Sequence, residues 1–309
     1  MSQLFSVNSL GGFLNNDTLS MQIRHASQTM QKFRQFVNME PAAGTRRGAS
    51  VFYNKISNIS TAGGTLVETS TIPKNNFTIT QGTLAITEYG NSVPMTFKSK
   101  ILSANDIDNA TRTVLRDDMA KVLDSAAATQ YQASDYVATI VNTATTTFGS
   151  ASAAVAAQGA DMSDKNVRDI IDQMKKLNIP KVDGENYVCV ASTNAIRGLY
   201  DFFEAKAQNT TMSPLFKGEI GQYYGCRFVE ETNFLSNVTG TGSNNGEAIF
   251  FGADAVREGV AVPEELRVDI PKDFGRDQAI AWYYLGGFQK VWDFTADGET
   301  RIIRTGHSV

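Results

Sequence analysis

Residues 279–287 read AIAWYYLGG, and this stretch decides the fold. Both alternating sets of its side chains are apolar, which is typical of a strand in the middle of a sheet with both faces covered. The next residues, 288–294 (FQKVWDF), alternate between apolar and polar side chains. Asp297 and Gly298 then offer a tight two-residue turn into 299–304 (ETRIIR), which predicts a final β-hairpin.

Two amphipathic helices are predicted before this strand. Residues 103–133 carry apolar side chains at helical spacing, and Asp106 lies where a carboxylate favours the N-terminal dipole. At about 1.5 Å per residue this helix forms a rod of roughly 45 Å. Residues 163–178 repeat the helical pattern, with Ser163 as the cap and Pro180 just beyond the end.

Shorter elements lie between and after these helices. Strands are predicted at 136–141, 186–192, 223–231 and 248–253, and a short helix is predicted at 194–207. The order does not repeat a strand–helix–strand unit. The pattern therefore predicts an α+β fold.

The N-terminal segment is also predicted to contain a helix. Apolar residues recur at spacings of three and four between residues 16 and 37. Such a helix either lies on the surface of its own core or forms an arm that docks on another subunit. Residues 1–50 carry five basic and two acidic side chains, a net charge of +3, whereas residues 184–264 carry five basic and ten acidic ones, a net charge of −5.

Residues 46–100 read as strand and turn throughout. Phe77 and Ile79 alternate with threonines, and Leu84 and Ile86 repeat the pattern further along. A hairpin this long and this poor in apolar residues has little core of its own, and an isolated two-stranded ribbon is marginally stable in water. It either packs on its own domain or finds its partner in a neighbouring subunit. The candidate inter-subunit contacts are Arg46, Arg47, Phe77, Ile79, Leu84 and Ile86.

Composition argues against catalysis and against a generic nucleic-acid binder. The 309 residues carry a net charge of −4, two cysteines and two histidines. Cys189 and Cys226 lack the spacing of a zinc module, and His25 and His307 lie near the ends of the sequence. No phosphate-binding loop, nucleophile elbow, HExxH or dinucleotide-binding motif occurs. We therefore expect no catalytic, metal or cofactor site, and no membrane-spanning or secretory segment.

Residues 270–294 (IPKDFGRDQAIAWYYLGGFQKVWDF), followed by 298–304 (GETRIIR), resemble the end of major capsid proteins of tailed double-stranded DNA phages. The likeness is to a branch of this length found in some short-tailed phages. It implies the Hong Kong 97-type capsid fold and a structural, non-enzymatic function in which copies form the pentamers and hexamers of an icosahedral head.

The resemblance also implies a division of the chain. Residues 1–45 would be the N-terminal arm and 46–100 the extended loop. Residues 101–183 and 265–309 would form the peripheral domain with its long spine helix, and 184–264 the axial domain. Some relatives crosslink a loop lysine to a late asparagine. Lys55 and Lys74 lie in the loop here, but no asparagine follows Asn245, so we expect no such crosslink.

The implied partners are copies of the chain itself, a scaffolding protein, a portal, a cement or decoration protein, and packaged double-stranded DNA bound without sequence specificity. The implied location is the virion, assembled in the bacterial cytoplasm. Two other functions remain open: a phage tail, spike or surface-layer subunit, and a hydrolase with an unrecognised site.

Overall fold

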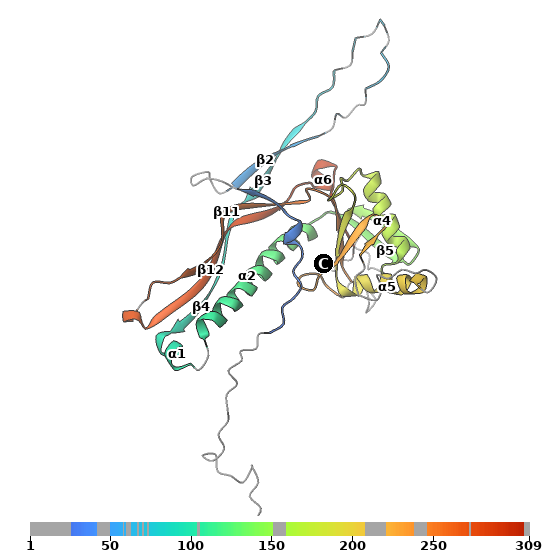
Figure 1. Cartoon of the computed structure of the whole chain (residues 1–309). Helices are drawn as coiled ribbons and strands as arrows, with labels where there is room; N and C mark the ends of the chain where they lie inside the picture. Colours follow the sequence, from blue (N-terminus) through green and yellow to red (C-terminus); the bar gives the residue numbers. More distant parts are fainter. Residues whose placement is uncertain are drawn as a thin grey trace, which may run out of the picture.

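A computed structural model of the chain describes residues 26–41, 50–57, 59, 63–66, 68–69, 71–72, 74–103, 106–150, 159–207, 221–237, 246–271 and 273–305. Helices pack on sheets whose strand pairings are mostly antiparallel, so the predicted α+β class is confirmed. Figure 1 shows an elongated molecule in which a long diagonal helix lies beside a twisted sheet, a second sheet carries further helices, and a narrow hairpin projects from one end.

The first sheet is four-stranded, with the order β1-β11-β12-β4. Strand β12 is central because it pairs antiparallel with both β11 and β4. On one face of β12, Ile280, Trp282 and Tyr284 are buried, whereas Tyr283 and Leu285 on the other face are only half-buried. The predicted central strand is confirmed, but within one chain only one of its faces is fully covered. The strands are β1 (Asn38–Pro41), β4 (Thr87–Thr96), β11 (Val256–Val268) and β12 (Asp277–Lys290).

Helix α2 (Ile107–Gln132) covers the buried face of this sheet, and the short helix α1 (Phe97–Leu102) precedes it. The side chain of Asp106 accepts a hydrogen bond from the Asn109 backbone and so caps α2. The indole of Trp282 donates to Asp118 on α2 at 2.9 Å, which fixes the helix against β12. The long predicted helix is therefore confirmed with its boundaries shifted by a few residues.

The second sheet is seven-stranded, with the order β6-β5-β13-β10-β7-β9-β8. One face packs on α4 (Asp164–Lys176) and α5 (Thr193–Ala207), and the other packs on the C-terminal half of α2. Ser163 caps α4 in a reciprocal capping box with Asn166. The strands are β5 (Tyr136–Asn142), β6 (Thr145–Ser150), β7 (Tyr187–Ala191), β8 (Gln222–Tyr223), β9 (Cys226–Glu230), β10 (Ala248–Phe251) and β13 (Ile302–Thr305).

The predicted N-terminal helix is wrong in the part that the structure describes, which begins at residue 26. Residues 26–32 form neither helix nor strand, Arg34–Phe36 form one 3₁₀ turn, and β1 follows. Phe33 explains the difference, because its fully buried ring lies 5.4 Å from that of Tyr131 on α2. Tertiary burial of this ring outweighs a helical preference that an isolated segment realises only weakly.

The predicted final hairpin is also wrong. Residues after β12 form the short helix α6 (Phe294–Asp297), which ends at Gly298 in the left-handed conformation, with φ of 68°. The chain then enters the second sheet, where β13 lies between β10 and β5. Asp297 and Gly298 therefore carry the chain from one sheet to the other.

Asp293 gives the stability of this connection a dependence on pH. Burial alone would raise its pKa, but hydrogen bonds from Lys290 and Asp135 lower the pKa of Asp293 from 3.8 to about 2. A carboxylate with a lowered native pKa stabilises the fold above its ordinary pKa and loses that contribution as the pH falls toward the native value. We expect the melting temperatures of wild type and Asp293→Asn to differ near neutral pH and to converge between about pH 4 and pH 2. A difference that stays constant over this range would contradict the assignment.

Candidate assembly surfaces

The hairpin formed by β2 (Ser50–Ile56) and β3 (Ile79–Ala85) projects away from both sheets (Figure 1). In its register Ile56 lies opposite Ile79, and Phe52 lies opposite Thr83. Cross-strand neighbours point to the same side, so one face of the hairpin gathers several large apolar side chains. We call this the hairpin surface: Phe52, Ile56, Phe77 and Ile79, which are 60%, 61%, 53% and 58% exposed.

The opposite face of the hairpin is fastened to the chain's own core. Leu84 is buried with Tyr53 and Val291, and it reaches this position because Gly259 and Gly287 lack side chains where its methyl groups lie. The Tyr53 hydroxyl donates to the Lys290 carbonyl at 3.2 Å. These contacts hold the base of the hairpin while the rest of it stands clear.

Lys55 adds an ion pair to the base of the hairpin. Its ammonium lies 2.6 Å from the Asp297 carboxylate, and both side chains are largely buried. Because Asp297 belongs to α6, the pair ties the hairpin to the connection between the two sheets. Lys55, one of the two loop lysines considered for a crosslink, is therefore engaged within its own chain.

The predicted contact residues divide between the two faces of the hairpin. Phe77 and Ile79 are exposed on the hairpin surface. Leu84 is only 1% exposed, so its prediction as a contact with another subunit is corrected to a core position. Ile86 is partly buried beside the same cluster. Arg46 and Arg47 lie outside the described residues, so their predicted contact stays a prediction.

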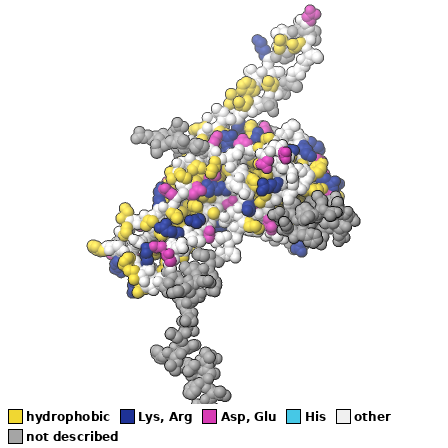
Figure 2. Space-filling model, viewed as in Figure 1, with side chains coloured by type: hydrophobic (Ala, Val, Ile, Leu, Met, Phe, Trp, Pro, Cys, Tyr) yellow, Lys and Arg dark blue, Asp and Glu magenta, His cyan; other side chains and the backbone are white. Residues whose placement is uncertain are grey.

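A second exposed apolar surface lies at the far end of the four-stranded sheet, and sequence reasoning missed it. We call it the tip surface. Figure 2 shows hydrophobic side chains both here and along the projecting hairpin. The available signal was the occurrence of large apolar side chains beside turn-forming residues, as in Ile270-Pro271 and Phe274-Gly275. Its members are Phe97, Ile101, Leu102, Val268 and Ile270, which are 51%, 61%, 71%, 56% and 81% exposed, and Phe274, which is fully exposed.

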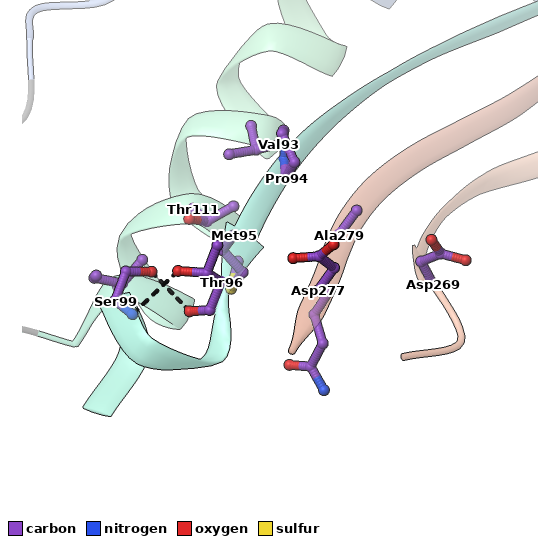
Figure 3. Close-up of a pocket in the computed structure, with 11 residues that line it drawn as sticks. Val93, Pro94, Met95, Thr96, Ser99, Thr111, Asp269, Asp277 and Ala279 are labelled. Atoms are coloured by element: carbon purple, nitrogen blue, oxygen red, sulfur yellow. Dashed lines mark hydrogen bonds between the residues drawn. The ribbon is translucent and has the colours of Figure 1, made fainter. Parts of the chain in front are cut away.

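A groove of about 620 Å³ opens beside the tip surface (Figure 3). Thr96 and Ser99 form one wall, where the Ser99 backbone donates to the Thr96 hydroxyl at 3.2 Å and so caps α1. Asp277 and Asp269 line it from β12 and the turn before it. Its lining mixes apolar and polar groups, so its geometry offers a shape for docking.

The segment before β1 is fastened by a buried ionic network. Arg34 lies 2.8 Å from Glu258, which is fully buried, and 3.2 Å from Glu264. Burial alone would lower the pKa of Arg34, but hydrogen bonds to the two carboxylates raise it above its ordinary value. The Tyr284 hydroxyl donates to the same Glu258 at 2.8 Å. Residues 33–36 are thereby held against the four-stranded sheet.

In the described stretches, no cluster of three or more His, Cys, Asp or Glu side chains could hold a metal ion. Burial raises the pKa of the Cys189 thiol well above its ordinary value, which disfavours its thiolate, and Cys226 is buried beside it. Over the same residues, no helix is long and apolar enough to cross a membrane.

Comparison with known protein families identifies the family of this chain. The profile of a family described as phage capsid protein matches residues 80–296. No curated protein matches the sequence significantly. The chain belongs to the phage capsid protein family. Its fold is of the Hong Kong 97 type, and it is a structural major capsid protein of a tailed-phage head, a component of the virion capsid.

Solved structures resemble the chain over its whole length at low sequence identity. The head of Helicobacter pylori bacteriophage KHP40 matches with a TM-score of 0.73 and 12% identity, covering 99% of this chain and 98% of that one. The capsid of cyanophage P-SCSP1u gives 0.70 and 13%, covering 98% and 97%. The capsid of Ralstonia phage GP4 gives 0.65 and 16%, covering 100% and 99%. At these identities the likeness shows the shared fold.

Proposed function

We propose that copies of this chain assemble into the pentamers and hexamers of an icosahedral head that encloses double-stranded DNA. The observation that carries the proposal is the hairpin surface, where four large apolar side chains stand more than half exposed on a ribbon with no core beneath that face. A patch of this kind is typical of a surface that becomes buried in an interface. A neighbouring copy is the partner that a shell supplies at every position.

Assembly then rests on many modest contacts. A standard protein interface buries about 1,600 Å² in total, and each copy in a shell meets several neighbours. The hairpin surface and the tip surface lie at opposite ends of the molecule, so they reach different neighbours (Figures 1 and 2). Contacts that are individually weak become durable when several must break together.

We also propose a division of the chain into an arm (1–45), an extended loop (46–100), a peripheral part with the spine helix α2, and an axial part. The strand composition of the two sheets favours different boundaries between the peripheral and axial parts from those drawn along the sequence. Strands β5, β6 and β13 share one sheet with β7 to β10, so they belong with 184–264 rather than with α2. The four-stranded sheet and α2 form the peripheral part, which therefore takes in β1 from 1–45, β4 from 46–100 and most of β11 from 184–264.

The proposed role is structural, without catalysis or a cofactor. The further partners follow from the head: a scaffolding protein, a portal, a cement or decoration protein, and DNA held without sequence-specific binding. A net charge of −4 fits a shell that encloses DNA without binding it strongly. Assembly takes place in the host bacterial cytoplasm.

Electron microscopy of the full-length chain, expressed alone and with a co-expressed scaffolding protein, tests the proposal. We expect closed shells built of capsomers. Sheets or fibres would contradict it and favour a tail, spike or surface-layer subunit.

We expect the paired substitution Arg46→Ala/Arg47→Ala to lower the melting temperature of assembled shells. The two guanidinium groups lie between β1 and the hairpin in the sequence, and the acidic segment 184–264 of another copy offers carboxylates to bind them. Calorimetry of purified shells gives the measurement. The matched control is Arg46→Lys/Arg47→Lys, which keeps both charges. Shells of the alanine variant that assemble and resist heat like wild type would contradict the contact.

A further inference from the structure

Residues 26–36 dock onto α2 and onto the loop after β9 through a set of polar contacts that we call the clasp. The Arg34 backbone N–H donates to the Asp124 carboxylate of α2 at 3.0 Å. The Met30 backbone donates to the Thr232 hydroxyl at 3.0 Å, and the Thr232 backbone donates to the Met30 carbonyl at 3.3 Å. The clasp therefore joins three parts of the chain that are far apart in sequence.

Asn233 lies at the centre of the clasp. Its amide oxygen accepts from the Thr29 hydroxyl at 3.1 Å, and its amide nitrogen donates to the Ser125 hydroxyl of α2 at 3.0 Å. Its backbone N–H donates to the carboxylate of Glu231, which also accepts from the backbones of Phe234 and Leu235. Glu231 thus shapes the loop that receives residues 29 and 30.

Two carboxylates are buried in the clasp, and neither has a cationic partner within the part of the chain that the structure describes. Asp124 is 2% exposed and Glu231 is fully buried. The Asp124 oxygen Oδ2 has no hydrogen-bond partner in the described structure. Residues 26–36 carry Lys32 and Arg34, and Lys121 lies three residues before Asp124 on α2. The guanidinium of Arg34 binds Glu258 and Glu264 instead, and among the described residues no ion pair reaches either clasp carboxylate.

An uncompensated buried carboxylate favours its neutral form. Burial raises the pKa of Asp124, and the N–H groups around it offset this only in part. Burial also raises the pKa of Glu231, the backbone N–H groups of residues 233–235 offset this only in part, and the charge of nearby Asp124 adds to the rise. The two acids therefore hold protons more readily in the docked state than in an open state in which water reaches them.

We propose that the clasp is proton-linked: residues 26–36 are held more tightly against α2 when the Asp124–Glu231 pair takes up a proton, and they open more readily when both acids are ionised. The sign follows from linkage, because a group that binds a proton more tightly when docked stabilises the docked state as the pH falls through its native pKa toward its ordinary one. One proton changes the opening equilibrium by up to about tenfold per pH unit within that window. The device belongs to the single chain and does not depend on assembly.

Hydrogen–deuterium exchange of peptides covering residues 29–36, measured on the unassembled full-length protein from about pH 7 to about pH 4 and corrected for intrinsic exchange, tests the proposal. For wild type we expect protection to rise up to about tenfold per pH unit as the pH falls. Asp124→Asn imitates the protonated acid, so its protection should exceed that of wild type at neutral pH, and the remaining rise, which Glu231 alone causes, should move to lower pH. Asp117→Asn, two turns earlier on α2 and outside the clasp, is the matched control and should keep the wild-type trend.

Wild-type protection that stays flat or falls on acidification would overturn the proposal, as would an Asp124→Asn chain that keeps the wild-type trend. If Asp124→Asn does not fold, Glu231→Gln is the alternative variant for the same measurement. Removing the second charge should move the rise in protection to lower pH, because Asp124 then ionises more easily. An unchanged midpoint in Glu231→Gln would show that the two acids do not act as a pair.

Discussion

The Arg34→Met chain should unfold with a free energy about 3–5 kcal/mol below that of wild type. Arg34 is the only cation within ion-pair distance of Glu258 among the described residues, and the Glu258 side chain is 0% exposed. Methionine keeps most of the apolar stem but leaves this carboxylate buried without a counter-charge. The Tyr284 hydroxyl still donates to Glu258, yet one neutral donor does not replace a guanidinium. Urea unfolding of the unassembled chain, followed by tryptophan fluorescence, gives the measurement.

Arg267→Met is the matched control for this result. Arg267 pairs with Glu265, but both side chains are about half exposed, at 51% and 47%. An exposed ion pair contributes about 0–1 kcal/mol, so this variant should unfold close to wild type. Equal effects of the two substitutions would contradict the claim that burial of Glu258 makes the Arg34 contact strong.

The double variant Phe77→Asp/Ile79→Asp should fold normally and fail to form shells. Both side chains are more than half exposed in the single chain, at 53% and 58%, so the new carboxylates remain in water until two copies meet. Substitutions at exposed positions usually change the free energy of unfolding by no more than about 0.5 kcal/mol. Burying two unpaired charges in an interface, by contrast, is strongly unfavourable. Sedimentation and electron microscopy should show free subunits.

Phe77→Leu/Ile79→Leu is the matched control, since it keeps the surface apolar and should assemble. Shells formed by the aspartate variant at wild-type yield would show that the hairpin surface stays in water after assembly. A loss of unfolding free energy in that variant would instead indicate that Phe77 and Ile79 stabilise the single chain.

The sequence predicts the elements well where local pattern and burial agree. Helix α4 begins at the capping box of Ser163, and β12 is central as its apolar run indicates. The failures occur where contacts distant in sequence decide. Phe33 belongs to an apolar stripe with helical spacing, but its ring is buried against α2 in a segment that forms only one 3₁₀ turn. The pairing of β13 with β5 and β10 has no local signal at all.

The sequence of the hairpin already distinguishes its exposed face from its buried face. Phe77 and Ile79 are odd-numbered, whereas Leu84 and Ile86 are even-numbered, so in one continuous strand they point to opposite faces. The register confirms that Ile79 and Leu84 lie on opposite faces, with Leu84 in the core. Each pair alternates with threonine or other small residues within its own short stretch, and this pattern predicts all four residues as contacts with another subunit. The change of parity across Gly82 was the available signal for separating them.

The position of β13 also has a consequence for synthesis. This strand follows every other strand of the seven-stranded sheet in the sequence, yet it lies between β5 and β10. While the chain is still emerging from the ribosome, β5 and β6 pair with no strand of the β10-β7-β9-β8 half, and the edge of β10 that later binds β13 is unpaired. Contacts between distant parts of a chain form late in folding. A chain whose translation stops before residue 302 therefore cannot complete this sheet.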